Sequence, residues 1–305
     1  MGTTTLQKSV GILADSNSLG QDNIYHYCGV DSFFHIVNSQ SMFLSSTRYM
    51  NDKADFRWVR HLLTEKMLSQ HSISTDPKRL THLNSLLEDD IRLSGGEAFI
   101  ACFSLQGDLL SQWSRYADNN KGVSIGFNVN VLHNVLKGFN TYNREAVVSG
   151  RGIPLSAVSR FQMKPVIYGI EEQYRNLSLD RPYHSTNGPV TALCDTADHL
   201  VWQSTYLKSP TFSEESEVRI AYMPEINVTD RIEIKGGNDK LKYRTSNGKL
   251  IPFFLLKLGS QAISSVTLGA ECKLTELEVH RFLVSVGINL DRSKITRTDS
   301  TYTNA

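Results

Sequence analysis

The residues that could do chemistry are concentrated in one segment, SEESEVRIAY, which runs from Ser213 to Tyr222. If this segment is a strand, Glu217 and Arg219 share one face and Glu215 joins them, because side-chain direction repeats every second residue. Neighbouring carboxylates raise one another's pKa and an arginine lowers it, so the surroundings of Glu217 set its charge. The grouping is typical of an active-site carboxylate and also of an exposed strand edge with a cross-strand ion pair.

The composition is that of an ordinary globular protein, with 305 residues of which 40% are hydrophobic and 21% charged. A net charge of +1 provides no long-range field for nucleic acid, so such a partner would need a local basic patch. The four cysteines form no CxxC pair, which argues against a disulfide framework or a zinc knuckle. No signal peptide or apolar run of ~18 residues is present. We therefore expect a cytoplasmic protein with reduced thiols and no membrane partner.

Strands are predicted where short runs of β-branched and aromatic residues stand between turn residues. Besides SEESEVRIAY, these runs are 25–27, 42–44, 98–105, 122–127, 166–168, 241–245, 250–258 and 263–269. Ser246-Asn247-Gly248 separates two of them, and Asn-Gly between apolar runs is a strong hairpin signal.

Helices are predicted where apolar residues recur on one helical stripe. The stripes span 30–37, 54–68, 77–93, 131–136 and 190–201, and a further helix opens at the capping box of Thr275 and Glu278. Residues 140–152 and 180–189 are predicted loops, and 1–22 and 291–305 are predicted polar tails. The sequence therefore predicts an α+β fold of mixed short-stranded sheets with inserted helices, in a single domain over 23–290.

Several polar and aromatic segments resemble one uncharacterised bacterial family, domain of unknown function two-nine-seven-one. They are Tyr25-His26-Tyr27, FLSSTRYMND at 43–52, CFSL at 102–105, QWSRYADNNKGVSIGF at 112–127, LKSPTFSEESEVRI at 207–220 and ISSVTLGAECKL at 263–274. The chain departs from the family at Lys53, where relatives commonly carry proline, and at Phe212, where tryptophan is frequent. The family name implies no activity.

A more distant resemblance does imply one. Tyr25-His26-Tyr27, followed by a helix and a short strand, is similar to the opening of histidine-first ADP-ribosyltransferases, which include DNA-modifying toxins. Those enzymes end their catalytic core with a glutamate that enters a strand, which is the position of Glu217. The resemblance implies an ADP-ribosyltransferase-like core and an NAD-consuming toxin or anti-phage effector that modifies an unknown macromolecular acceptor, protein or nucleic acid. It implies that His26 holds the nicotinamide ribose and that Glu217 bonds the ribose hydroxyl. Glu215 is the expected same-face partner of Glu217 from the strand spacing.

Other residues would complete an NAD site. The planar fork of arginine suits phosphate oxygens, so Arg48 and Arg115 are candidates for the pyrophosphate, while Arg219 would hold Glu217 ionised. The aromatic candidates for stacking on nicotinamide or adenine are Tyr49, Trp113 and Tyr116. We also include Tyr27 and Asn51 among the candidate cofactor-binding residues. The chain has no Gly-x-Gly-x-x-Gly or Walker sequence, so this site would not be of the Rossmann type.

Several of these residues also have a structural interpretation. His26 fits a half-buried strand position between two tyrosines. Trp113 and Tyr116 are three residues apart, a spacing that suits one helical face packed on the core. Asn51 fits a helix cap together with Asp52.

Two other functions stay open. Asp230 followed by Glu233-Ile234-Lys235 matches the grouping of metal-dependent nucleases, in which carboxylates hold a divalent ion and lysine aids the attacking water. That triplet is short and lies outside the segments shared with the family. A non-catalytic module that binds a nucleotide or a partner fits the same fold.

Overall fold

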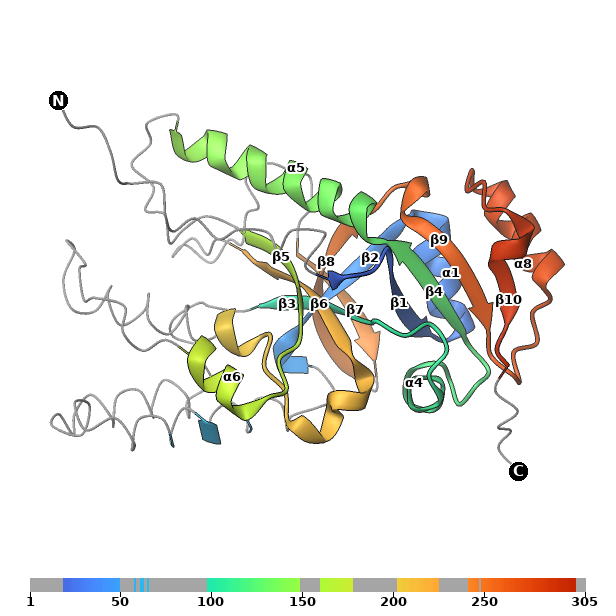
Figure 1. The fold of residues 1–305 in the computed structure, drawn as a ribbon. Helices are drawn as coiled ribbons and strands as arrows, with labels where there is room; N and C mark the ends of the chain where they lie inside the picture. Colours follow the sequence, from blue (N-terminus) through green and yellow to red (C-terminus); the bar gives the residue numbers. More distant parts are fainter. Residues whose placement is uncertain are drawn as a thin grey trace, which may run out of the picture.

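The computed structural model describes residues 19–49, 58, 61–62, 65, 98–148, 160–177, 202–224, 241–246 and 248–299. A ten-stranded sheet, antiparallel except at its β9–β10 end, lies at the centre of the described chain. Helix α1 lies behind β4 and β9, α8 stands beside β10, and α6 lies near β5 and β6 (Figure 1). The α+β class predicted from the sequence is confirmed.

The strands follow the order β10-β9-β4-β1-β3-β2-β8-β7, and β6 pairs with both β3 and β5. Their bounds are β1 Asn23–Cys28, β2 Ser41–Ser46, β3 Phe99–Ser104, β4 Val123–Asn128, β5 Arg160–Pro165, β6 Glu217–Met223, β7 Lys242–Ser246, β8 Lys249–Lys257, β9 Ile263–Leu268 and β10 Ile295–Arg297. The helices are α1 Val30–Ser39, α4 Leu110–Tyr116, α5 Val129–Val148, α6 Ile170–Asn176 and α8 Glu276–Ser285, with 3-10 turns η2 Thr47–Tyr49, η4 Pro210–Glu215, η5 Ser260–Ala262 and η6 Arg292–Lys294.

Strand β3 is the branch point of the sheet. One of its edges pairs with β1 through Ser104 and with β2 through Phe99 and Ile100. Its other edge pairs with β6 along the whole strand, from Phe99 opposite Tyr222 to Ser104 opposite Glu217. Because directly paired residues share a face, Ser104 and Glu217 project to the same side of the sheet.

The two faces of this central region differ in chemistry. Val218, Ile220 and Tyr222 of β6 belong to the main hydrophobic cluster, with alternating residues of β1, β3, β4 and β8. Glu217 and Arg219 project to the opposite face, as the alternation of a strand requires. The main core therefore lies on one side of β6 and buried polar side chains lie on the other.

Several predicted elements are confirmed. The hairpin of β7 and β8 forms around Gly248, which has a φ of 72° and so needs the conformational freedom of glycine. The capping box opens α8, because Thr275 accepts from the Glu278 backbone N–H and the Glu278 carboxylate accepts from that of Thr275.

Other predictions need correction. The predicted loop over 140–152 is helical as far as Val148, because α5 continues through residues with no proline to interrupt it. Strand β5 occupies 160–165 instead of 166–168. Residues 295–297, expected in a tail, pair with β9. The predicted helices over 77–93 and 190–201, and most of the one over 54–68, lie outside the described residues.

The described part of the chain includes three of the four cysteines, and Cys28, Cys102 and Cys272 are all free. Among the described residues, no helix combines the length and apolarity that crossing a membrane requires.

Candidate functional site

Glu215 reaches the site by a different route from the one predicted. The sequence predicted a strand that carries both Glu215 and Glu217, but Glu215 ends the 3-10 turn η4 and β6 begins only at Glu217. Ser216 between them has a φ of 45°, so the backbone turns through the left-handed region there. Two hydrogen bonds hold this turn against the end of β3: Leu105 N donates to Ser216 O at 2.9 Å and Ser104 Oγ donates to Glu215 O at 2.8 Å.

Glu217 and Arg219 form a bidentate ion pair on the polar face of β6. Arg219 Nε lies 2.7 Å from Glu217 Oε1 and Nη2 lies 3.0 Å from Oε2. Arg219 Nη1 also donates to the Thr205 carbonyl at 2.8 Å, and both charged side chains are at most 6% exposed. Burial alone would raise the pKa of Glu217, but Arg219 and then Lys208 lower it to about 2. Glu217 is therefore a carboxylate at neutral pH.

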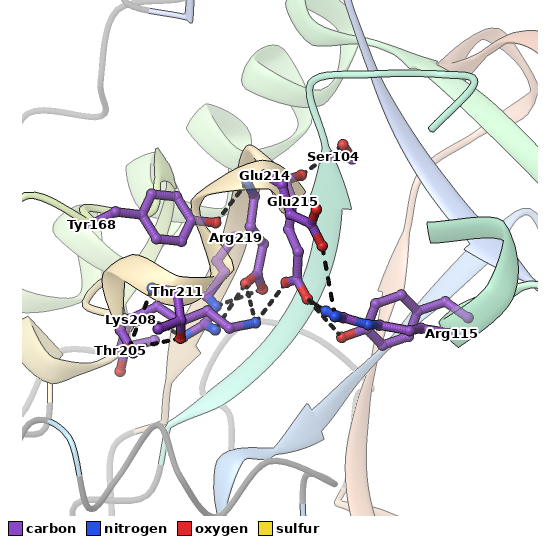
Figure 2. A network of polar contacts seen from close by, with 12 residues as sticks. Ser104, Arg115, Tyr168, Thr205, Lys208, Thr211, Glu214, Glu215 and Arg219 are labelled. Carbon is purple, nitrogen blue, oxygen red and sulfur yellow. Dashed lines mark hydrogen bonds and ion pairs between the residues drawn. The ribbon is translucent and has the colours of Figure 1, made fainter. Parts of the chain in front are cut away.

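Lys208 joins the two glutamates (Figure 2). Its Nζ lies 2.6 Å from Glu215 Oε2 and 3.2 Å from Glu217 Oε2, and its side chain is only 5% exposed. The same ammonium lies 4.8 Å from the centre of the Phe212 ring, a distance at which a cation and an aromatic face attract. Two buried carboxylates thus meet two buried cations, Lys208 and Arg219, in a balanced arrangement.

Arg115 forms the exposed side of the arrangement. Its Nη1 lies 2.9 Å from Glu215 Oε1 and its Nη2 lies 3.6 Å from Glu214 Oε1. The Arg115 side chain is 45% exposed, whereas that of Glu215 is 3% exposed. Tyr116, half exposed on the same helix α4, directs its hydroxyl toward Glu215 Oε1 at 3.4 Å. We call Arg115, Lys208, Glu215, Glu217 and Arg219 the charge cluster.

Two neutral groups border Glu217. The Tyr168 hydroxyl accepts a hydrogen bond from Glu217 N at 3.1 Å, and burial raises its pKa to about 12. Burial, followed by the negative charge of Glu217, raises the pKa of the Cys102 thiol. Both groups therefore keep their protons at neutral pH and add no charge to the cluster.

His26 does not meet Glu217. Tyr25 pairs with Ser104, and Ser104 with Glu217, so these three side chains share one face. His26 is the next residue of β1 and projects to the opposite, core face. There its ring lies 5.8 Å from Phe103, and its Nδ1 lies 2.8 Å from the Cys102 carbonyl oxygen. Strand parity therefore places His26 and Glu217 on opposite faces of the sheet, and the role that the resemblance gives His26 stays a prediction.

Tyr27 and Trp113 pack against each other. Their rings meet edge to face at 5.0 Å, and both are buried. Tyr27 Oη donates to the Gln106 carbonyl and accepts from Leu109 N, while Trp113 Nε1 donates to Asp108 Oδ1 at 2.6 Å. This pair anchors α4, the helix that carries Arg115 and Tyr116.

The remaining predicted residues lie elsewhere. Arg48 and Tyr49 are exposed on η2, and within the described ranges no hydrogen bond or ion pair joins either side chain to the charge cluster. Asn51 lies outside the described residues. So does the nuclease-like triplet that begins at Asp230, and the part of the chain that the structure covers contains no group of three or more potential metal ligands.

The structure also reveals site residues that the sequence reasoning missed. Lys208 and Phe212 belong to LKSPTFSEESEVRI, a segment already recognised as shared with the family, so a signal for them was present. Tyr168 lies in the run 166–168, which was predicted as a strand and carried no sign of a site. Its place at the site is recognised only in the structure, because the chain after β5 runs beside the start of β6, where Val166 N donates to Glu217 O at 2.8 Å.

Comparison with known proteins leads to one family. A family model described as "Protein of unknown function (DUF2971)" matches residues 112–220. The match begins on α4 and ends on β6, so it includes every member of the charge cluster. Searches among curated proteins and among solved structures gave no match.

Proposed function

We propose that this protein is an NAD-consuming, ADP-ribosyltransferase-like enzyme that transfers ADP-ribose to a macromolecular acceptor, with Glu215 as the carboxylate that acts on the substrate. The observation that carries the proposal is the position of Glu215. Its side chain is buried and ion-paired, yet one of its oxygens, Oε1, is bound by the half-exposed Arg115 and faces the half-exposed Tyr116.

The chemistry needs such a carboxylate. When the bond between the ribose C1′ and the nicotinamide nitrogen breaks, the electron pair leaves with nicotinamide and the ribose becomes an oxocarbenium-like cation. An acceptor nucleophile then bonds to C1′ and loses its proton. A carboxylate fixed beside the ribose stabilises the developing positive charge more than it stabilises the neutral sugar, so it lowers the barrier.

Glu215 suits this role better than Glu217 does. Both oxygens of Glu217 are bound by Arg219, and one of them is also bound by Lys208. Glu217 therefore acts in this proposal through Lys208, because a permanently ionised Glu217 keeps the ammonium at the cluster. Glu215 shares Oε2 with that ammonium and presents Oε1 toward the exposed side.

Arg115 gives the substrate a way to reach Glu215. A guanidinium binds phosphate oxygens as well as carboxylates, in the same planar geometry. In the proposed complex Arg115 turns from Glu215 to the pyrophosphate of NAD, which frees Oε1 to accept a hydrogen bond from a ribose hydroxyl. The rings of Tyr116 and Phe212, which border this side of the cluster, are then placed to stack on nicotinamide or adenine.

The test is nicotinamide release from NAD by the purified protein in the presence of cell lysate. We expect Glu215→Gln, which keeps the shape and removes the charge, to lower turnover about 100-fold, the usual effect of removing one electrostatic stabiliser. Glu214→Gln is the matched control, because Glu214 lies on the same turn with its side chain 53% exposed. Equal turnover in the wild type and Glu215→Gln refutes the proposal.

The balance of charge favours a second candidate, a nucleotide-binding module without turnover. Each oxygen of Glu215 and Glu217 already has a cationic partner, which is also how a purely structural ion network is built. Stabilisation of the folded protein by NAD without nicotinamide release supports the binding module over the enzyme.

A further inference from the structure

Gln173 on α6 is a buried polar side chain near the charge cluster that makes three hydrogen bonds. Its side chain is fully buried, and its amide nitrogen donates to the backbone carbonyls of Ile167 at 2.5 Å and Lys208 at 2.6 Å. Its amide oxygen accepts from the indole N–H of Trp58 at 3.0 Å. Both donor hydrogens and the acceptor are therefore used, a state that a primary amide reaches only in a matched environment.

The two carbonyls belong to segments that carry groups of the site. Ile167 forms a parallel bridge with Leu207, Ile167 N donates to the Tyr206 carbonyl at 2.8 Å, and Lys208 N donates to the Ile167 carbonyl at 3.2 Å. The next residue after Ile167 is Tyr168, whose hydroxyl binds the backbone of Glu217. Gln173 thus links the segment of Tyr168 to the segment of Lys208 by one hydrogen bond to each.

We propose that Gln173 is a positioning residue for the charge cluster, which fixes the Lys208 backbone so that its ammonium bridges Glu215 and Glu217. The role in turnover rests on the proposed function, whereas the role in fixing Lys208 does not. Lysine has a long flexible side chain. Two hydrogen bonds hold the Lys208 backbone, one from its N–H to the Ile167 carbonyl and one from Gln173 Nε2 to its own carbonyl. They limit the positions that the ammonium reaches. Trp58 completes the arrangement by satisfying the amide oxygen, which would otherwise be a buried acceptor without a partner.

Gln173→Glu isolates the donated hydrogen bonds. It keeps the side-chain shape, but a carboxylate donates neither bond and a protonated carboxyl group donates only one of them. Gln173→Met removes all polar atoms and keeps a similar length, so it shows what packing alone contributes. Gln203→Met is the matched control, because Gln203 Nε2 donates to the Asn176 carbonyl at the end of the same helix.

The deciding measurement is the rate at which an amine-reactive acylating reagent labels Lys208, followed residue by residue by mass spectrometry in the folded protein. Lys208 is buried and ion-paired, so wild-type labelling is slow, and the exposed Lys121 serves as the internal reference. We expect labelling of Lys208 to rise about tenfold in Gln173→Glu and in Gln173→Met, the effect of losing one or two modest hydrogen bonds. In Gln203→Met the rate stays at the wild-type value.

Thermal unfolding separates positioning from folding. If Gln173→Met melts within a few degrees of the wild type and labels faster at Lys208 only, the proposal holds. An unchanged Lys208 rate in both Gln173 variants overturns it, as does an equal rise at the half-buried Lys164. Where wild-type protein releases nicotinamide, we further expect kcat to fall about tenfold in Gln173→Met with KM within threefold. A wild type without turnover contradicts the proposed function and leaves the labelling result decisive for Gln173.

Discussion

The two faces of β6 are both buried, and they differ in chemistry at the end of the strand that carries Glu217 and Arg219. Val218, Ile220 and Tyr222 pack into the main hydrophobic cluster, while Glu217 and Arg219 on the other face form a bidentate ion pair. The apolar face is favourable because it removes hydrocarbon from water. The polar face is different, since the cost of desolvating buried charges offsets most of their attraction. Stability alone therefore explains the first face but not the second, which is the physical reason to look for function there.

The most damaging change should be the removal of one buried charge. Arg219→Met leaves Glu217 in a buried position with only Lys208 as a cationic partner, and we expect the free energy of unfolding to fall by about 3–5 kcal/mol. Urea unfolding followed by circular dichroism measures this loss. The double variant Glu217→Leu with Arg219→Met should recover at least half of it, because no buried charge is then unbalanced. A loss below about 1 kcal/mol in the single variant would mean that the two faces differ less than we infer.

Acid should weaken the polar face selectively. The pKa of Glu217 is lowered in the folded protein to about 2 from an ordinary value of 4.5, so its contribution is complete above 4.5 and is lost as the pH falls toward 2. The shift corresponds to a contribution on the order of 3 kcal/mol. In Glu217→Gln the fall in stability between pH 4.5 and pH 2.5 should be smaller than in the wild type by a comparable amount. Parallel curves for the two proteins would contradict the assignment of this titration to Glu217.

The smallest effect is expected on the apolar face. Ile220→Val removes one methylene group from the core and should cost about 1 kcal/mol, measured by the same urea unfolding. Because no charged group is disturbed, the dependence of stability on pH should keep its wild-type form. A change in that form would show that the two faces are coupled through the strand.

The sequence predicts the apolar face better than the polar one, for a physical reason. The apolar runs of β3, β4 and β6 and the capping box of α8 are local patterns, and the corresponding elements form as expected. The charge cluster is assembled from the segment before η4, η4 itself and the start of β6, and from α4, whose Arg115 lies 100 residues before Glu215. No local sequence pattern predicts such contacts.

Single residues illustrate the same limit. Glu217 and Arg219 were predicted together because two residues of one strand share a face. Lys208 was missed although it lies in LKSPTFSEESEVRI, because the resemblance marks the segment and does not show which of its residues meet. Glu215 was predicted for the site on the wrong grounds, because the left-handed turn at Ser216 was not foreseen. His26 was assigned to Glu217 by resemblance, although its place in the pairing of β1 with β3 puts it on the other face.

The branching of β3 has a consequence for how the chain folds during synthesis. One edge of β3 can pair with β1 and β2, which are made before it, but the other edge waits for β6, which begins at Glu217. At about 5–20 residues per second, the ribosome needs on the order of ten seconds to make the chain between Ser104 and Glu217. During that interval β3 presents an unpaired row of backbone donors and acceptors, the kind of edge that recruits other chains. Growth temperature and translation rate should therefore affect the yield of folded protein even when the finished sheet is stable.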